Sequence, residues 1–89
     1  MLAANVWCAG FELDLVVRRG RSLAFVEVKS KAGAGYGDPL EMVTPVKADR
    51  VRRAAAAWLA AHPELAGLAV RFDVVAERAR RIDVLQDAF

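Results

Sequence analysis

Three acidic side chains and one lysine, set at strand spacing, are the residues of this sequence best suited to chemistry. They are Glu12, Asp14, Glu27 and Lys29. Because alternate residues of a strand point to the same face, Glu12 and Asp14 share one face, and so do Glu27 and Lys29. Such carboxylates suit a hard divalent cation, and the lysine could orient or deprotonate a water or neutralise charge on a phosphate. The pattern favours phosphodiester hydrolysis.

A β-hairpin over residues 11–31 is predicted to bring the two pairs together. Gly20-Arg21 suits a two-residue turn, with glycine at the position that needs positive φ. In that register Asp14 lies opposite Glu27, and Glu12 lies opposite Lys29. Carboxylates that face each other across a ladder repel and destabilise a sheet, unless a cation lies between them. The alternative is a solvated charged face, and the residues alone leave both interpretations open.

The other elements follow from hydrophobic periodicity and turn residues. The first hairpin strand is expected to turn Phe11, Leu13, Leu15 and Val17 to one face and Glu12, Asp14 and Val16 to the other. In the segment before it, Trp7 is interpreted as a packing residue rather than a platform for bases. The expected elements are a brief edge strand within residues 1–10, the hairpin, a glycine-containing loop over 30–44, a helix over 45–61, and strands over 68–77 and 82–85.

The predicted helix combines an N-terminal cap, an apolar side and a basic stripe. Thr44-Pro45 matches an N-cap followed by proline at the first helical position. The apolar side consists of Val51, Ala55, Trp58 and Leu59, and the basic stripe consists of Lys47, Arg50 and Arg53. The stripe, together with Lys31, is a candidate for phosphate contacts with a nucleic acid. A solvating face is an equally favoured interpretation.

Composition bounds the class of protein. The chain has 89 residues, so a single domain over 1–89 is expected, and a net charge of +2 does not by itself indicate nucleic-acid binding. One cysteine and one histidine are too few for a disulfide framework, a Cys/His metal cluster or a Ser-His-Asp triad. Neither a long apolar run nor a signal-peptide pattern is visible, so a cytoplasmic protein without a membrane partner is expected.

Several segments together resemble one bacterial family. They are GFELDL (10–15), FVEVK (25–29), GDP (37–39), VTPVK (43–47), RFDVV (71–75) and the terminal Ala88-Phe89. These segments, in this order, are similar to the YraN family, which is assigned to the restriction-endonuclease-like, or PD-(D/E)XK, superfamily. The E-x-K hairpin is also similar to that of archaeal Holliday-junction resolvases.

The resemblance implies an α/β fold with a restriction-endonuclease-like core, in which a mixed central sheet carries the site on a β-hairpin beside one main helix. It implies a nuclease that depends on Mg²⁺ or Mn²⁺ and acts on DNA, including branched or damaged DNA. Asp14, Glu27 and Lys29 match the catalytic D…E-x-K, and Glu12 matches a further family glutamate. The metal would be held by Asp14, Glu27 and the carbonyl of Val28.

Two features depart from the family pattern. Phe11 stands where the family usually has glycine. Family members also begin with a helix, and this sequence starts after it. If the protein lacks that helix, we expect one sheet face to be uncovered, which favours a homodimer through that face or insolubility. Two further hypotheses accompany the nuclease: a non-catalytic nucleic-acid-binding module of the same fold, and an interaction domain whose charged hairpin face is only solvated.

Overall fold

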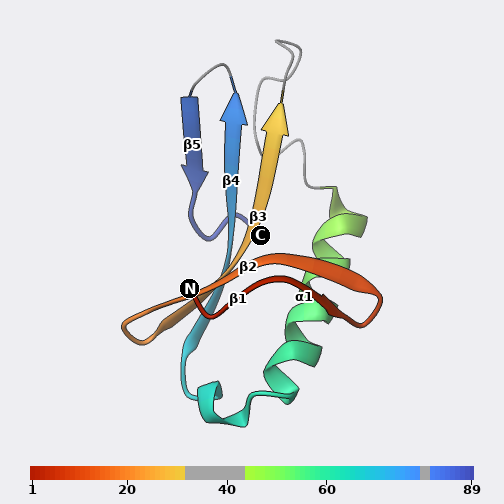
Figure 1. The fold of residues 1–89 in the computed structure, drawn as a ribbon, viewed down its shortest axis with the longest axis vertical. Helices are drawn as coiled ribbons and strands as arrows, with labels where there is room; N and C mark the ends of the chain where they lie inside the picture. The colour runs from red at the N-terminus through yellow and green to blue at the C-terminus, as the bar shows by residue number, and fades with distance from the viewer. Residues whose placement is uncertain (32–43, 79–80) are drawn as a thin grey trace.

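A five-stranded mixed sheet with one main helix forms the framework of the fold (Figure 1). The computed structural model describes residues 1–31, 44–78 and 81–89, and it describes residues 30, 31 and 78 by their backbone only. The elements are β1 (Ala3–Cys8), β2 (Phe11–Arg19), β3 (Ser22–Lys31), α1 (Pro45–Ala60), the 3-10 helix η2 (Pro63–Leu65), β4 (Ala69–Arg78) and β5 (Arg81–Leu85). The strands lie in the order β1-β2-β3-β4-β5, with β3 and β4 parallel and the other neighbours antiparallel. The expected mixed α/β arrangement is confirmed.

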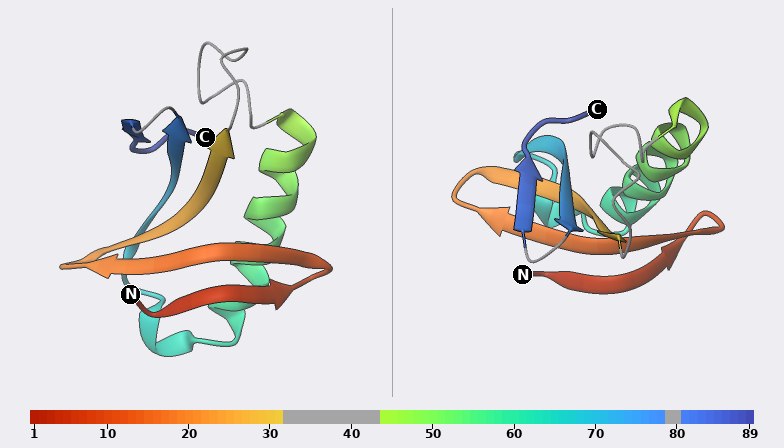
Figure 2. Two further views of the ribbon diagram at one scale, coloured as in Figure 1. Left: turned by 45° about the horizontal axis from the view of Figure 1, so that its top comes forward. Right: turned by 90° about the horizontal axis from the view of Figure 1, so that it is seen from above.

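The predicted register of the β2–β3 hairpin is confirmed at its turn end. Arg19 pairs with Ser22 around Gly20, whose φ is 60°, and the pairing continues to Leu15 opposite Val26. Beyond that point β2 remains paired with β1, while β3 remains paired with β4. Figure 2 shows the β1–β2 pair crossing the direction that β3 and β4 follow. The expected cross-strand pairs of Asp14 with Glu27 and of Glu12 with Lys29 are therefore not part of the ladder.

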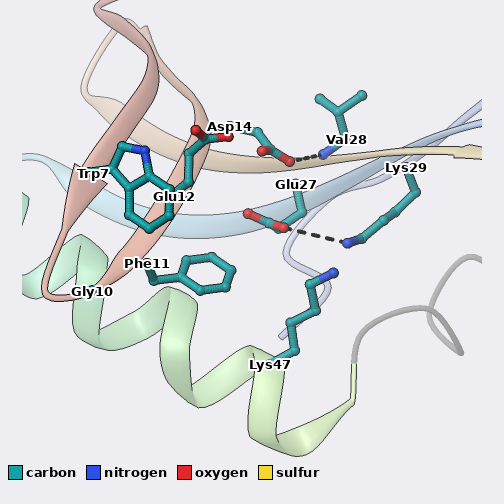
Figure 3. A pocket seen from close by; sticks show the side chains of 9 residues that line it. All are labelled: Trp7, Gly10, Phe11, Glu12, Asp14, Glu27, Val28, Lys29 and Lys47. Carbon is teal, nitrogen blue, oxygen red and sulfur yellow. Dashed lines mark hydrogen bonds and ion pairs between the residues drawn. The ribbon is translucent and has the colours of Figure 1, made fainter.

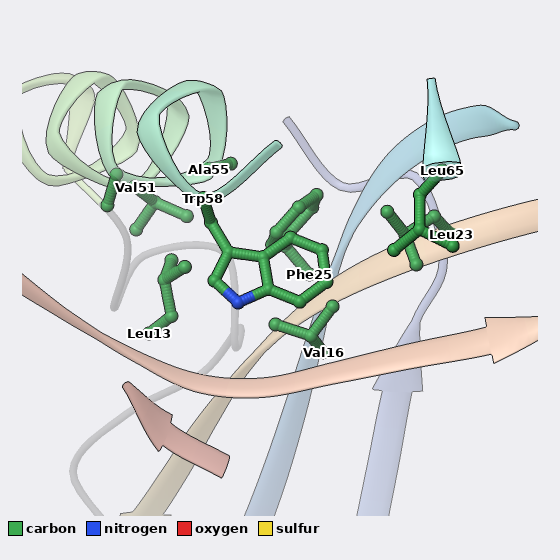
Figure 4. Close-up of a cluster of buried hydrophobic side chains, with 9 residues drawn as sticks. Leu13, Val16, Leu23, Phe25, Val51, Ala55, Trp58 and Leu65 are labelled. Atoms are coloured by element: carbon green, nitrogen blue, oxygen red, sulfur yellow. The ribbon is translucent and has the colours of Figure 1, made fainter. Parts of the chain in front are cut away.

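Helix α1 covers one face of the sheet and closes the hydrophobic core (Figure 4). The helix begins where the sequence predicts, because the Thr44 side chain accepts a hydrogen bond of 3.2 Å from the Lys47 amide. Trp58 packs edge-to-face on Phe25, with ring centroids 5.8 Å apart. The core cluster consists of Leu13, Val16, Leu23, Phe25, Val51, Ala54, Ala55, Trp58 and Leu65. Among the described helices, none is long and apolar enough to cross a membrane.

Strict alternation along β2 was a wrong expectation at Val16. Val16 is 0% exposed and lies in the core with Leu13, three residues away, although it was expected on the charged face. The strand therefore twists between Leu13 and Val16, so that both side chains point to the core although they are three residues apart. On β1, the residue opposite this rotation is Asn5, whose φ is 53°. Both strands therefore twist at one place, and period two fails across it.

Other boundaries differ only slightly from expectation. Strand β3 continues to Lys31, past the expected start of the loop over 30–44, and residues 32–43 lie outside the described residues. The 3-10 helix η2 was not expected. At the other end of the chain Phe89 stacks on Phe72, with ring centroids 5.3 Å apart, and fixes the C-terminus against the core.

The β1–β2 turn leads to a prediction about stability. Ala9 and Gly10 join Cys8 to Phe11 with φ values of 52° and 77°, which is typical of a type I′ turn. An alanine with positive φ is strained, whereas asparagine tolerates this region. Ala9→Asn should therefore raise the free energy of unfolding in urea by about 1 kcal/mol. Ala66→Asn is the control, because Ala66 is exposed with a φ of −63°, and an equal gain there would contradict the turn assignment.

Candidate functional site

The divergence of β2 from β3 leaves a pocket of about 420 Å³ that is lined from three strands and the helix (Figure 3). All four residues on which the sequence analysis centred line this pocket, together with Val28 and the helix residue Lys47. The lining residues are Trp7, Gly10, Phe11, Glu12, Asp14, Glu27, Val28, Lys29 and Lys47. The predicted gathering of three carboxylates and a lysine is thus found, although it arises from strand divergence rather than from direct cross-strand pairing.

Asp14 lies at the point where the strands separate. Its Oδ2 accepts a hydrogen bond of 2.9 Å from the Val28 backbone amide. This bond satisfies a main-chain donor next to the end of the β2–β3 ladder. A single carboxylate therefore bridges the two strands and also presents its charge to the pocket.

Glu27 is a buried carboxyl group with a strongly raised pKa. The residue is only 3% exposed, because its side chain shares the helix-covered face of β3 with Leu23 and Phe25. Burial is the main cause that raises its pKa to about 7, and the negative charge of Asp14 adds to the effect. Lys29 and Lys47 act in the opposite direction. At neutral pH the carboxyl group is close to half protonated, and a nearby positive charge would ionise it.

Lys29 forms an ion pair with Glu27. Its Nζ lies 3.8 Å from Glu27 Oε2, and its side chain is only 16% exposed. Burial lowers the pKa of Lys29, and the neighbouring Lys47 lowers it further, while Glu27 and Asp14 oppose the shift. Lys47 lies in the first turn of α1, just after the Thr44 cap, so the start of the helix brings a second ammonium group to the pocket (Figure 3).

The predicted basic stripe on the helix is divided by the structure. Lys47 lines the pocket, whereas Arg50 is exposed and does not line it. Arg53 forms an ion pair with Asp49, with 2.9 Å between Nε and Oδ2. The side chain of Lys31 lies outside the described residues. Of the four predicted nucleic-acid contacts, only Lys47 is therefore placed beside the carboxylates.

Trp7 was missed as a site residue, and its interpretation as a packing residue was wrong. The residue is 70% exposed and lines the pocket. Its partner across the β1–β2 ladder is Glu12. Recognition of the two-residue turn at Ala9-Gly10 would have revealed this pairing in the sequence, because a tight turn fixes the register of the strands that it joins.

Comparison with known proteins places the chain in a family. The model of uncharacterised protein family UPF0102 matches residues 1–76. The chain belongs to this family. The predicted membership of the YraN family is thereby confirmed.

Relatives from several bacteria support the UPF0102 assignment. The chain is 46% identical over 92 residues to a UPF0102 protein of Acidothermus cellulolyticus, covering 93% of the chain and 70% of the relative. It is 52% identical over 75 residues to one from Frankia casuarinae, covering 84% of the chain and 63% of the relative. A relative from Alkalilimnicola ehrlichii is 40% identical over the full chain, which spans 71% of that relative. This UPF0102 chain thus spans roughly two thirds of the length of these relatives.

The donor set of the UPF0102 pocket fits a hard cation that keeps part of its water shell. Within residues 1–31, 44–78 and 81–89, no group of three or more His, Cys, Asp or Glu side chains is arranged to hold a metal ion. The pocket instead offers Asp14 and Glu27 as a pair. Mg²⁺ is commonly held by one or two carboxylates together with waters and phosphate oxygens. Two carboxylates are therefore enough for this class of ion.

The raised pKa of Glu27 has a consequence for stability. Between pH 4.5 and about 7 the folded protein holds a proton that the unfolded chain releases, so this group's contribution to stability falls as pH rises through that window. Glu27→Gln should remove the fall and raise the free energy of unfolding at pH 8 by on the order of 1 kcal/mol, with no gain near pH 4.5. Urea unfolding at the two pH values measures both effects. Exposed Glu64→Gln is the control, and a clear loss of stability in Glu27→Gln at pH 8 would show Glu27 to be a structural partner instead.

The proximity of the two lysines predicts a shift in their titration. Because Lys47 helps to hold the pKa of Lys29 low, Lys47→Met should raise the pKa of Lys29 toward its ordinary value. Titration of ¹⁵N-labelled lysine side chains by NMR measures this pKa directly. Arg50→Met removes a charge one turn along the same helix, outside the pocket, and should leave it unchanged. Equal shifts in both variants would mean that Lys47 acts only through net charge.

Proposed function

We propose that this chain carries the site of a metal-dependent nuclease that hydrolyses phosphodiester bonds in DNA. The observation that carries the proposal is the convergence of Asp14, Glu27 and Lys29 in one pocket, with Glu27 buried beside a second carboxylate. A protein gains no stability from burying Glu27 beside the charge of Asp14, since burial and that charge both oppose the ionisation of Glu27. A bound divalent cation would reverse that cost, and the pattern D…E-x-K is the one that the resemblance associates with this chemistry.

Each pocket residue has a role in the proposed reaction. Asp14, Glu27 and the Val28 carbonyl would hold Mg²⁺ or Mn²⁺, which when bound supplies positive charge to polarise the phosphate and acidify a water. Lys29, partly buried and close to Glu27, orients the attacking water or neutralises the charge that develops on the phosphate. Lys47 adds a second ammonium group for a phosphate oxygen, and Glu12 is an accessory ligand or base.

The arrangement of elements supports a restriction-endonuclease-like core for this proposal. The acidic residue lies on β2 and the E-x-K residues lie on β3, with α1 packed against the same sheet. Likeness of this hairpin to archaeal Holliday-junction resolvases makes branched DNA a substrate to test beside duplex and flapped DNA. Exposed Arg50 and Arg53 would extend the contact along the phosphate backbone. A homodimer stays a prediction of the sequence analysis.

The proposal predicts a cation site that depends on two side chains. Calorimetric titration should detect Mn²⁺ binding to the wild-type chain, and Asp14→Asn/Glu27→Gln should abolish it because both carboxylate ligands are lost. Asp49→Asn/Glu64→Gln makes the same change of charge at exposed positions and should bind as the wild type does. Absence of binding in a folded wild-type chain, or equal loss in both double variants, would contradict a metal site at this pocket.

Cleavage tests the reaction itself. With Mn²⁺ present, the wild type should cut labelled duplex, flapped or four-way DNA, and Lys29→Ala should lower the rate by about 10²-fold or more while DNA binding remains. The control is Glu64→Gln, which lies away from the pocket. DNA that is bound but never cut would favour the alternative hypothesis of a non-catalytic nucleic-acid-binding module.

A further inference from the structure

We propose that Trp7 is a stacking platform for an unpaired base, which makes DNA with single-stranded nucleotides the substrate class of this pocket. The inference rests on the proposed function, and it adds a residue that the D…E-x-K pattern does not contain. Its basis is the position and exposure of one aromatic ring beside the carboxylates and lysines.

The exposure of Trp7 is fixed by its strand. Val6 and Cys8, its neighbours on β1, are partly buried and pack against the core. Since successive strand residues point to opposite faces, Trp7 must point away from that core. The side chain is accordingly 70% exposed, whereas the other tryptophan, Trp58, is 4% exposed and stacks on His62 with ring centroids 3.9 Å apart.

The register of β1 and β2 places the Trp7 ring at the site. Trp7 pairs with Glu12 across the ladder, and cross-strand partners project to the same face. The type I′ turn at Ala9-Gly10 holds this register. Figure 3 shows the indole ring beside Glu12 and on the same side of the hairpin as Asp14. The ring therefore forms one wall of the pocket whose other wall carries the lysines.

The two walls suit the two parts of a nucleotide. Lys29 and Lys47 provide ammonium groups for a phosphate, and Trp7 provides a flat apolar surface for the attached base. Base–aromatic stacking is independent of base identity, because every base has a π-face. Within a duplex both faces of a base are covered by its neighbours, so stacking on Trp7 requires a base that has left the stack. A single strand, a flap or an opened junction provides one without the cost of unpairing.

The experiment measures DNA binding in EDTA, so that neither metal binding nor cleavage enters the result. Fluorescence anisotropy with labelled oligo(dT) and with a labelled duplex gives the two dissociation constants. Trp7→Ala should weaken oligo(dT) binding by about tenfold and leave duplex binding unchanged, while Trp7→Phe should retain most of the affinity because a ring remains. Ile82→Ala is the matched control, since it removes an exposed apolar side chain of β5 that is not in the pocket.

A second readout reports stacking directly. Saturating oligo(dT) should quench the tryptophan fluorescence of the wild type, and the quenching should disappear in Trp7→Phe, where only the buried Trp58 emits. The inference is overturned if the wild type does not bind oligo(dT), if Trp7→Ala weakens single-strand and duplex binding equally, or if the quenching survives in Trp7→Phe. If the protein cleaves DNA but gives one of these results, only the stacking role of Trp7 is contradicted. If bases stack on Trp7 but the protein binds no Mn²⁺, only the nuclease proposal is contradicted.

Discussion

The hydrogen bond between the Val28 amide and the Asp14 carboxylate marks the constraint on which the site depends. Two antiparallel strands that begin as a tight hairpin must separate here, because β2 follows β1 while β3 follows β4. Separation leaves main-chain groups of the two strands without partners in the β2–β3 ladder, and the Val28 amide is paired with the Asp14 carboxylate instead. A side-chain carboxylate that accepts such a bond allows the strands to part without an unpaired donor. The same parting opens the pocket that the carboxylate faces.

Burial of Glu27 follows from this geometry and has a cost. Residues 23, 25 and 27 of β3 share the face that α1 covers, so the strand continues its buried face with a carboxyl group after leucine and phenylalanine. Its raised pKa expresses the cost of that placement. Phe25 and Trp58 provide the packing that offsets it, through an edge-to-face contact at the centre of the core. Glu27 is thus held in place by the apolar core, which includes Phe25, two residues earlier in β3.

Local signals predicted the parts of the fold that local chemistry determines. Gly20 fixed the hairpin register, and Thr44-Pro45 fixed the start of α1, since a turn and an N-cap depend on a few adjacent residues. The position of Val16 was not predictable from alternation, because strand twist between residues 13 and 16 moves it into the core. Lys47 was predicted as a phosphate contact, but its place beside the carboxylates comes from helix packing, which the sequence does not show. The place of Trp7 was missed because the β1–β2 turn has alanine where asparagine or glycine is usual.

The charged groups of the pocket influence one another's ionisation, and this coupling affects how the proposed cation and a phosphate of the DNA would bind together. Glu27 is neutral in part at pH 7, and its negative charge, when present, favours the ammonium form of Lys29. A divalent cation would ionise Glu27, but its two positive charges exceed the one negative charge gained, so the bound cation would oppose the ammonium form of Lys29. A phosphate placed near Lys29 and Lys47 would favour the ammonium form, since it offsets the repulsion among the positive charges. Cation and phosphate would then each raise the affinity for the other, because their charges are opposite and thermodynamic coupling between two sites is reciprocal.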